Sequence, residues 1–228
     1  MSHLVSEQLK KIKRTIPEQV KLVAVSKTKP IEDILEAYKA GQICFGENKA
    51  QEMEAKQAAL PSDIEWHFIG HLQTNKVKYI APFVSLIEAV DSLKLLKEIN
   101  KQASKFNRQI PCLLQFHIAE EETKFGLNRE EAITMLESDT YKKMKNIQIS
   151  GVMGMATFTE DMQQVQREFI HLREIFNWLK STYFPQEDSF KEISMGMSGD
   201  YPIAIEAGAT IVRVGSLIFG ERNYSATE

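Results

Sequence analysis

The chain has 228 residues, of which 43% are hydrophobic, and it carries a formal net charge of −3. This length suits one large domain or two small ones, with enough apolar content for a packed core. The charge offers no positive field for nucleic acid or an anionic membrane, and we find neither an 18-residue apolar run that could span a membrane nor a signal peptide.

An amphipathic helix is expected first, over residues 4–14. Short apolar runs then recur along the chain, and most of them end in polar or glycine-rich tips. Such runs are typical of the strands of a parallel sheet. We expect strands over residues 22–25, 43–45, 66–69, 84–87, 112–118, 147–152, 190–194 and 211–214.

The segments between these strands contain good helix formers with start and stop signals. Ser92 and Asn128 are expected to be N-caps, and Pro202 lies in the first turn of a short helix. We expect helices over residues 31–40, 49–59, 72–80, 93–106, 129–137, 162–179 and 201–207.

Eight strand–helix units at a fairly even spacing favour a parallel sheet closed into a (β/α)₈ barrel, with one extra helix in front. The alternative is an open, doubly wound sheet. No linker, low-complexity tract or sharp change in composition interrupts the chain. We therefore expect residues 1–228 to form a single domain.

The two cysteines, Cys44 and Cys112, each lie inside an apolar run. We interpret both as small, buried core residues of a reduced, cytosolic protein rather than as a disulfide.

Lys27 follows the first strand at the end where a parallel barrel holds its ligands. A lysine close to a turn is usually a solvated surface residue, and Lys27 alone indicates nothing more. Its interpretation depends on what the other strand ends carry.

Two loops carry the elements of a phosphate site, in the two places where barrels commonly bind phosphate. Ser198 lies in the glycine-containing loop after the seventh strand, and Gly215 and Ser216 follow the eighth. Either loop alone is better explained as an ordinary helix cap or turn. Together they favour a phosphate cup built from amides and hydroxyls.

Arg213 lies within the eighth strand, where a barrel has its core. A buried arginine needs a partner, which could be an interior carboxylate such as Glu47 or Glu206. Alternatively, the guanidinium points at a ligand atom just below the phosphate cup.

An amine, a phosphate cup and an arginine in one barrel mouth suit a phosphorylated aldehyde such as pyridoxal 5′-phosphate (PLP). Lys27 would form a Schiff base with the aldehyde. Arg213 would donate to the ring nitrogen and, because it keeps its own proton, hold that nitrogen unprotonated. Asn48, after the second strand, could bind the phenolic oxygen. His67 and His71 are four residues apart across a strand end, with no third ligand evident, so we expect no metal site there.

Motifs along almost the whole chain resemble those of the pyridoxal phosphate homeostasis proteins, which are similar to the N-terminal barrel of alanine racemase. The motifs are LVAVSKTKP (22–30), FGENKAQE (45–52), WHFIGHLQTNK (66–76), TKFGL (123–127), GVMGMATF (151–158), SMGMSGDYPIAIEAG (194–208) and VRVGSLIFG (212–220).

The resemblance implies a fold type III PLP protein in which Lys27 is the Schiff-base lysine. It further implies that Asn48 lies beside the ring and that Arg213 faces the ring nitrogen. The phosphate positions that it implies are Ser198, Gly215 and Ser216. The family's inferred role is to bind PLP and to balance free PLP, amino acids and keto acids.

Racemisation by two bases needs a proton donor on each face of the substrate. In alanine racemase the second donor comes from a further domain, and here only residues 221–228 follow the last motif, where Tyr224 is a poor candidate. We therefore expect a cytoplasmic, monomeric PLP carrier without robust catalytic activity. Its partners would be PLP and candidate recipient apo-enzymes.

Two alternatives remain open. One is a weak PLP-dependent amino-acid racemase. The other is a Schiff-base aldolase acting on a sugar phosphate, which the lack of a carboxylate obviously paired with Lys27 disfavours.

Overall fold

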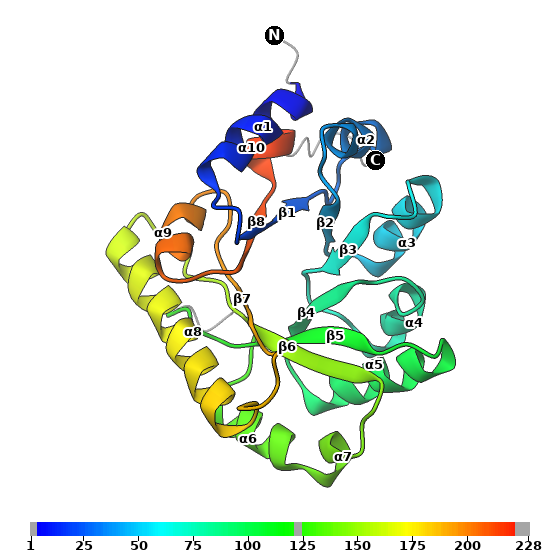
Figure 1. The fold of residues 1–228 in the computed structure, drawn as a ribbon, viewed down its shortest axis with the longest axis vertical. Coiled ribbons are helices and arrows are strands. Elements are labelled where there is room, and N and C mark those ends of the chain that lie inside the picture. The colour runs from blue at the N-terminus through cyan, green and yellow to red at the C-terminus, as the bar shows by residue number, and fades with distance from the viewer. Residues whose placement is uncertain (1–3, 121–124, 222–228) are drawn as a thin grey trace.

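The computed structural model describes residues 4–120 and 125–221, and their strands close into one parallel barrel in sequence order (Figure 1). The closing pair is β1 with β8, in which Val23 lies beside Arg213. The strands are β1 (Lys21–Val25), β2 (Cys44–Glu47), β3 (Glu65–Phe68), β4 (Leu86–Val90), β5 (Ile110–Gln115), β6 (Ile147–Met153), β7 (Glu192–Ser194) and β8 (Ile211–Val214). The predicted barrel is confirmed.

Helices surround the barrel and alternate with its strands, and the predicted extra helix α1 precedes β1 (Figure 1). They are α1 (Val5–Thr15), α2 (Ile31–Lys39), α3 (Ala50–Ala59), α4 (Val77–Ile80), α5 (Leu93–Lys105), α6 (Arg129–Glu137), α7 (Asp139–Lys142), α8 (Met162–Thr182), α9 (Tyr201–Glu206) and α10 (Ser216–Phe219), with a short 3₁₀ turn η1 (Thr74–Lys76) before α4. The first helix lies beside α10, so the two ends of the described chain meet on one side (Figure 1).

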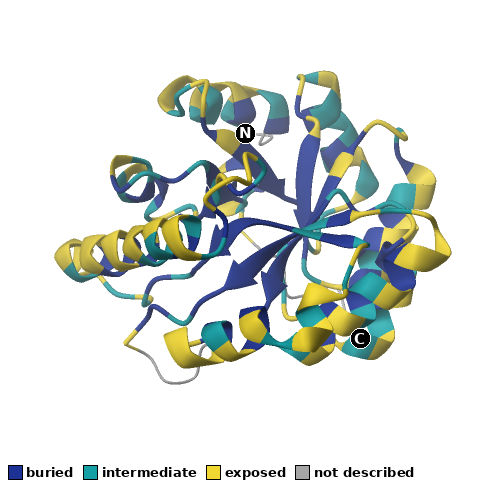
Figure 2. Cartoon of the chain, turned by 60° about the horizontal axis from the view of Figure 1, so that its bottom comes forward, coloured by how far each residue is buried: buried dark blue, intermediate teal, exposed yellow. Residues whose placement is uncertain are grey.

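Alternation along each strand divides the buried side chains into two layers. Phe45 and Trp66 face outward and join the large core between sheet and helices, with ring centroids 6.1 Å apart. Cys44 and Val23 face inward and belong to a small apolar cluster inside the barrel. The strands are almost wholly buried, whereas the helices expose their outer faces (Figure 2).

The structure corrects several of the predicted bounds. The fifth strand ends at Gln115 instead of residue 118, because Phe116 leaves the barrel and forms a bridge with Leu127. Residues 72–80 form η1 and α4 rather than one helix. The short helices α7 and α10 were not predicted, since four residues are too few to show a helical period.

The expected caps are confirmed, and so is the burial of both cysteines. Ser92 caps α5 through the amide of Leu95, and Asn128 forms a capping box with Glu131. Both cysteines are buried free thiols, and burial raises the pKa of Cys112. Within the described ranges, no helix has the length and apolar character needed to cross a membrane.

Candidate functional site

A cavity of about 420 Å³ opens at the carboxyl ends of the strands, where a parallel barrel places its active site. Five of the six residues that the sequence singled out line it together. They are Lys27, Ser198, Arg213, Gly215 and Ser216. Residues from the two ends of the sequence thus share one cavity because β1 and β8 are neighbours in the closed sheet.

A buried polar network holds the residue that precedes Lys27. The hydroxyl of Ser26 donates to Glu47 Oε1 at 2.6 Å, and Lys56 Nζ donates to the Ser26 carbonyl at 2.8 Å. Lys56 also pairs with Glu47 at 2.7 Å and, one turn earlier on its own helix, with Glu52 at 2.7 Å. The backbone before Lys27 is therefore fixed from β2 and α3.

The contacts of Ser26 with Glu47 and Lys56 were not predicted from the sequence. The available signal was Glu47 beside Asn48 at the end of a strand, since a charge at a buried strand end requires a partner. Burial raises the pKa of Glu47 even though Lys56 and Ser26 favour its charged form.

Lys29 has a separate structural task. Its Nζ donates to the carbonyls of Phe219, Gly220 and Glu221 at 2.9, 3.0 and 2.9 Å. A lysine at this position satisfies carbonyls that the end of α10 leaves open. The turn after β1 therefore anchors the helix whose first residue, Ser216, lies in the cavity wall.

The two candidate phosphate loops contact each other directly. The backbone N–H of Gly215 donates to the hydroxyl of Ser198 at 3.2 Å. Gly196 lies just before this loop with φ of 92°, and a Cβ there would come within 2.5 Å of the Ala204 side chain. Glycine is therefore required for the chain to turn tightly between β7 and α9.

Arg213 is fully inside the barrel and is held at several points. It donates to Ser194 Oγ at 2.6 Å and to the Gly154 carbonyl at 3.1 Å. Its carboxylate partner is Glu88, whose Oε2 lies 3.8 Å away. The sequence suggested Glu47 or Glu206, which is wrong for a physical reason: Glu88 points into the barrel from β4, whereas Glu47 points outward to α3.

Glu88 is the centre of a buried polar chain across the barrel. Its Oε2 accepts the Ser194 hydroxyl at 2.5 Å, and its Oε1 lies 2.6 Å from His67 Nδ1. Burial disfavours the charged forms of Glu88 and His67, but their polar contacts favour these forms more strongly. The contacts with His67, Arg213 and Ser194 hold the pKa of Glu88 below its ordinary range, and those with Cys44 and Glu88 raise the pKa of His67 to about 10.

Asn48 is the one predicted residue outside the lining of the cavity. It follows β2 at the same end of the barrel, with its Cβ against Gly70. Its Oδ1 is buried and has no hydrogen-bond partner among the described residues. A buried polar atom without a hydrogen-bond partner indicates a place for a polar ligand group.

The histidines do not act together. His67 lies inside the barrel, whereas His71 is about half exposed, pairs with Asp91 at 3.2 Å and stacks on Phe125. Thr123 and Lys124 of the TKFGL motif, and Tyr224, lie outside the described residues.

Residues 3–223 match the family model for the alanine racemase N-terminal domain. The pyridoxal phosphate homeostasis protein of Aquifex aeolicus is 42% identical over 205 residues, which cover 90% of this chain and 88% of that protein.

Solved structures show the same barrel. PipY of Synechococcus elongatus PCC7942, determined with PLP bound, is 34% identical with a TM-score of 0.85, covering 95% of this chain and all of that one. The alanine racemase of Bacillus anthracis is 16% identical with a TM-score of 0.70, covering 97% of this chain and 57% of its own, and it shares the fold.

Proposed function

The chain belongs to the pyridoxal phosphate homeostasis protein family, and on this premise we propose that it binds PLP in the cavity at the carboxyl ends of the strands. The observation that carries the proposal is the meeting of an amine, an arginine and two hydroxyl-bearing loops in that one cavity. The bound PLP of a relative at 34% identity supports it.

The residues present fit each polar part of PLP. The amides and hydroxyls of Ser198, Gly215 and Ser216 would hold the phosphate without a charged side chain. Arg213 would donate to the ring nitrogen, and Asn48, with its unsatisfied amide oxygen, would meet the phenolic group. Lys27 would form the Schiff base with the aldehyde.

Bound PLP supplies an electron sink for amino-acid chemistry, and the side chains around it set how strong that sink is. Arg213 cannot give up its proton, so it would keep the ring nitrogen unprotonated and the sink weak. The cavity mouth is open as well, because Ser216 is exposed and Phe158 on its rim is 93% exposed. These features suit a protein that holds and releases PLP more than one that drives catalysis.

As a carrier, the protein would serve PLP and amino/keto acid homeostasis in the cytoplasm and deliver PLP to apo-enzymes. We propose that it acts as a monomer and that residues 1–228 form a single PLP-binding domain. Light scattering of the purified protein should then give the mass of one chain, 26.0 kDa.

The decisive experiment is reductive trapping. Purified protein incubated with PLP should turn yellow, and borohydride should bleach it while fixing a pyridoxyl group on the peptide that contains Lys27. Lys27→Ala should abolish both signals, whereas Lys49→Ala, which alters an exposed lysine before α3, should keep them.

A colourless protein that stays colourless with added PLP would refute the proposal. Label on Lys29 in place of Lys27 would refute the assignment of the amine. Rapid conversion of L-alanine to D-alanine, abolished by Lys27→Ala, would replace the carrier by a racemase.

A further inference from the structure

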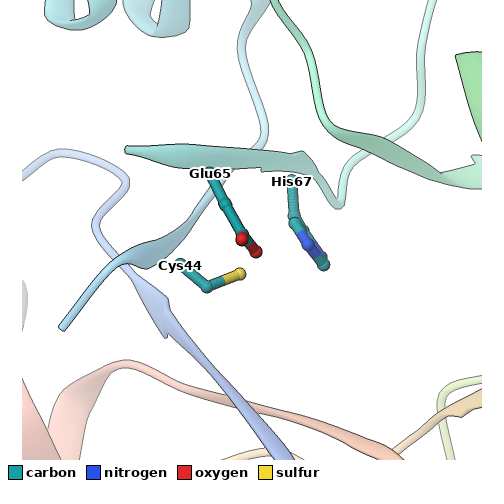
Figure 3. A group of neighbouring side chains, drawn as sticks. All are labelled: Cys44, Glu65 and His67. Atoms are coloured by element: carbon teal, nitrogen blue, oxygen red, sulfur yellow. The ribbon is translucent and has the colours of Figure 1, made fainter. Parts of the chain in front are cut away.

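Three potential metal ligands meet at the amino-terminal end of the barrel, opposite the proposed PLP cavity. They are the thiol of Cys44, the carboxylate of Glu65 and the imidazole of His67, and their ligand atoms all lie within 4.8 Å of one another. Figure 3 shows the three side chains extending from β2 and β3 into the same space.

The sheet itself sets this arrangement. Cys44 and Glu65 are register partners on neighbouring strands, so their side chains leave the sheet side by side. His67 is two residues further along β3 and therefore shares the inward face with Glu65. Spacing in the sequence relates His67 only to His71, because Cys44 is more than 20 residues away.

A carboxylate orients the imidazole for ligation. Glu88 Oε1 is 2.6 Å from His67 Nδ1, which leaves Nε2 as the nitrogen available to a ligand. Metal-binding histidines typically donate their other nitrogen to a carboxylate in this way, which fixes the ring and its tautomer. Glu88 is fully buried, so the support is rigid.

The cluster is also accessible. Glu65 and His67 line a cavity of about 460 Å³, and Cys44 and Glu65 line a second one of about 380 Å³ on the adjacent side. The floor of such a barrel normally serves stability. A thiol, an imidazole and a carboxylate around an opening there are therefore not explained by packing alone.

We propose that Cys44, Glu65 and His67 form a zinc site at the floor of the barrel, with a fourth position open to the cavity. Thiolate, imidazole and carboxylate are the ligand types that Zn²⁺ takes, and three protein ligands with one open position is a recurrent arrangement. The charges of one thiolate and one carboxylate balance the ion.

Binding requires two local changes. Zinc–ligand bonds of roughly 2.0–2.3 Å bring the ligand atoms of a tetrahedral site to about 3.5 Å from one another. The Glu65 side chain can supply that closure because it is about half exposed, but it must leave Lys21, whose Nζ lies 3.2 Å from its Oε2. The ion also displaces the protons from the Cys44 thiol and from His67 Nε2.

Titration of the purified protein with Zn²⁺, followed by calorimetry, and with Co²⁺, followed by absorbance, tests the site. We expect one equivalent to bind, and we expect Co²⁺ to give a thiolate charge-transfer band with tetrahedral visible bands. Cys44→Ser should remove the charge-transfer band and weaken Zn²⁺ binding at least tenfold. Cys112→Ser is the matched control, because that thiol is buried on the outward side of β5 and should leave both signals unchanged.

Three more variants sharpen the test without disturbing the buried chain at Glu88. Glu65→Gln should weaken Zn²⁺ binding at least tenfold, and Lys21→Met should strengthen it by freeing the Glu65 carboxylate. Lys27→Ala should leave it unchanged, so the result does not depend on PLP. Absence of binding, a cobalt spectrum without a thiolate band, or equal effects of Cys44→Ser and Cys112→Ser would overturn the proposal.

Discussion

Glu88 illustrates how one buried residue can join two ends of a fold. It touches His67 on one side and, through Ser194 and by its own charge, Arg213 on the other. One carboxylate thereby compensates two buried cations, which would each be costly alone. Glu88 therefore supports both Arg213, which would bind the PLP ring nitrogen, and His67, the proposed zinc ligand.

Glu88→Gln should therefore lower the free energy of unfolding by roughly 3 kcal/mol, the scale of removing one partner from a buried ion pair. Urea unfolding monitored by circular dichroism measures it. The matched control is Glu65→Gln in metal-free buffer, which breaks only the exposed pair with Lys21 and should cost about 1 kcal/mol or less. Equal losses in the two variants would contradict the role given to Glu88.

At the scale of elements, the long helix α8 is attached to the loop after β6 through one acid. Glu168 is buried and accepts hydrogen bonds from the amide and hydroxyl of Thr157 at 2.6 and 2.7 Å. It also accepts from the Glu120 amide at 3.2 Å and from Gln164 at 3.1 Å. Burial acts against the charge, but these bonds prevail and hold the pKa of Glu168 below its ordinary value.

A carboxyl whose pKa is lower in the folded chain adds stability above its unfolded pKa of about 4.3 and loses it as the pH falls through the folded value. Wild type should thus be more stable than Glu168→Gln at pH 7, and the difference should shrink as the pH falls below about 4.3. Urea midpoints measured across this range test the sign. A difference that grows toward acid pH would contradict it.

At the scale of the whole molecule, closure of the barrel depends on a tight contact between β6 and β7. Gly151 has φ of 152°, and a Cβ built there would lie 1.9 Å from the carbonyl oxygen of Glu192 on β7. The β5–β6 register shifts nearby, between Cys112 and Leu113, as at a bulge. A glycine at this point lets the sheet bend and close.

Gly151→Ala should separate β6 from β7 and lower the free energy of unfolding by roughly 3 kcal/mol, the upper end of the cost of overpacking. For a chain of this size that corresponds to a fall in Tm of about 6–12 °C, which differential scanning calorimetry would detect. Gly199 does not have a positive φ and a Cβ there meets nothing within 4 Å, so Gly199→Ala should change Tm by less than about 2 °C. An unchanged Tm in Gly151→Ala would contradict the requirement for glycine at this contact between β6 and β7.

The residues alone predicted the type and order of most elements, since β-branched runs, caps and helix periods are local signals. The helix Arg129–Glu137 and the strand Ile211–Val214 have the predicted bounds. The sequence also predicted that five candidate residues lie together in one cavity, because a parallel barrel brings the carboxyl ends of all its strands to one mouth. They are Lys27, Ser198, Arg213, Gly215 and Ser216.

Only the tertiary structure decided which side chains meet inside the barrel and between the barrel and its helices. The pairing of Arg213 with Glu88, the network of Ser26, Glu47 and Lys56, and the approach of Cys44 to His67 join residues from different strands and helices. Those contacts follow from sheet register and from which face of a strand points inward. Local sequence patterns determine that a strand forms, whereas closure of the sheet determines what lies across from it.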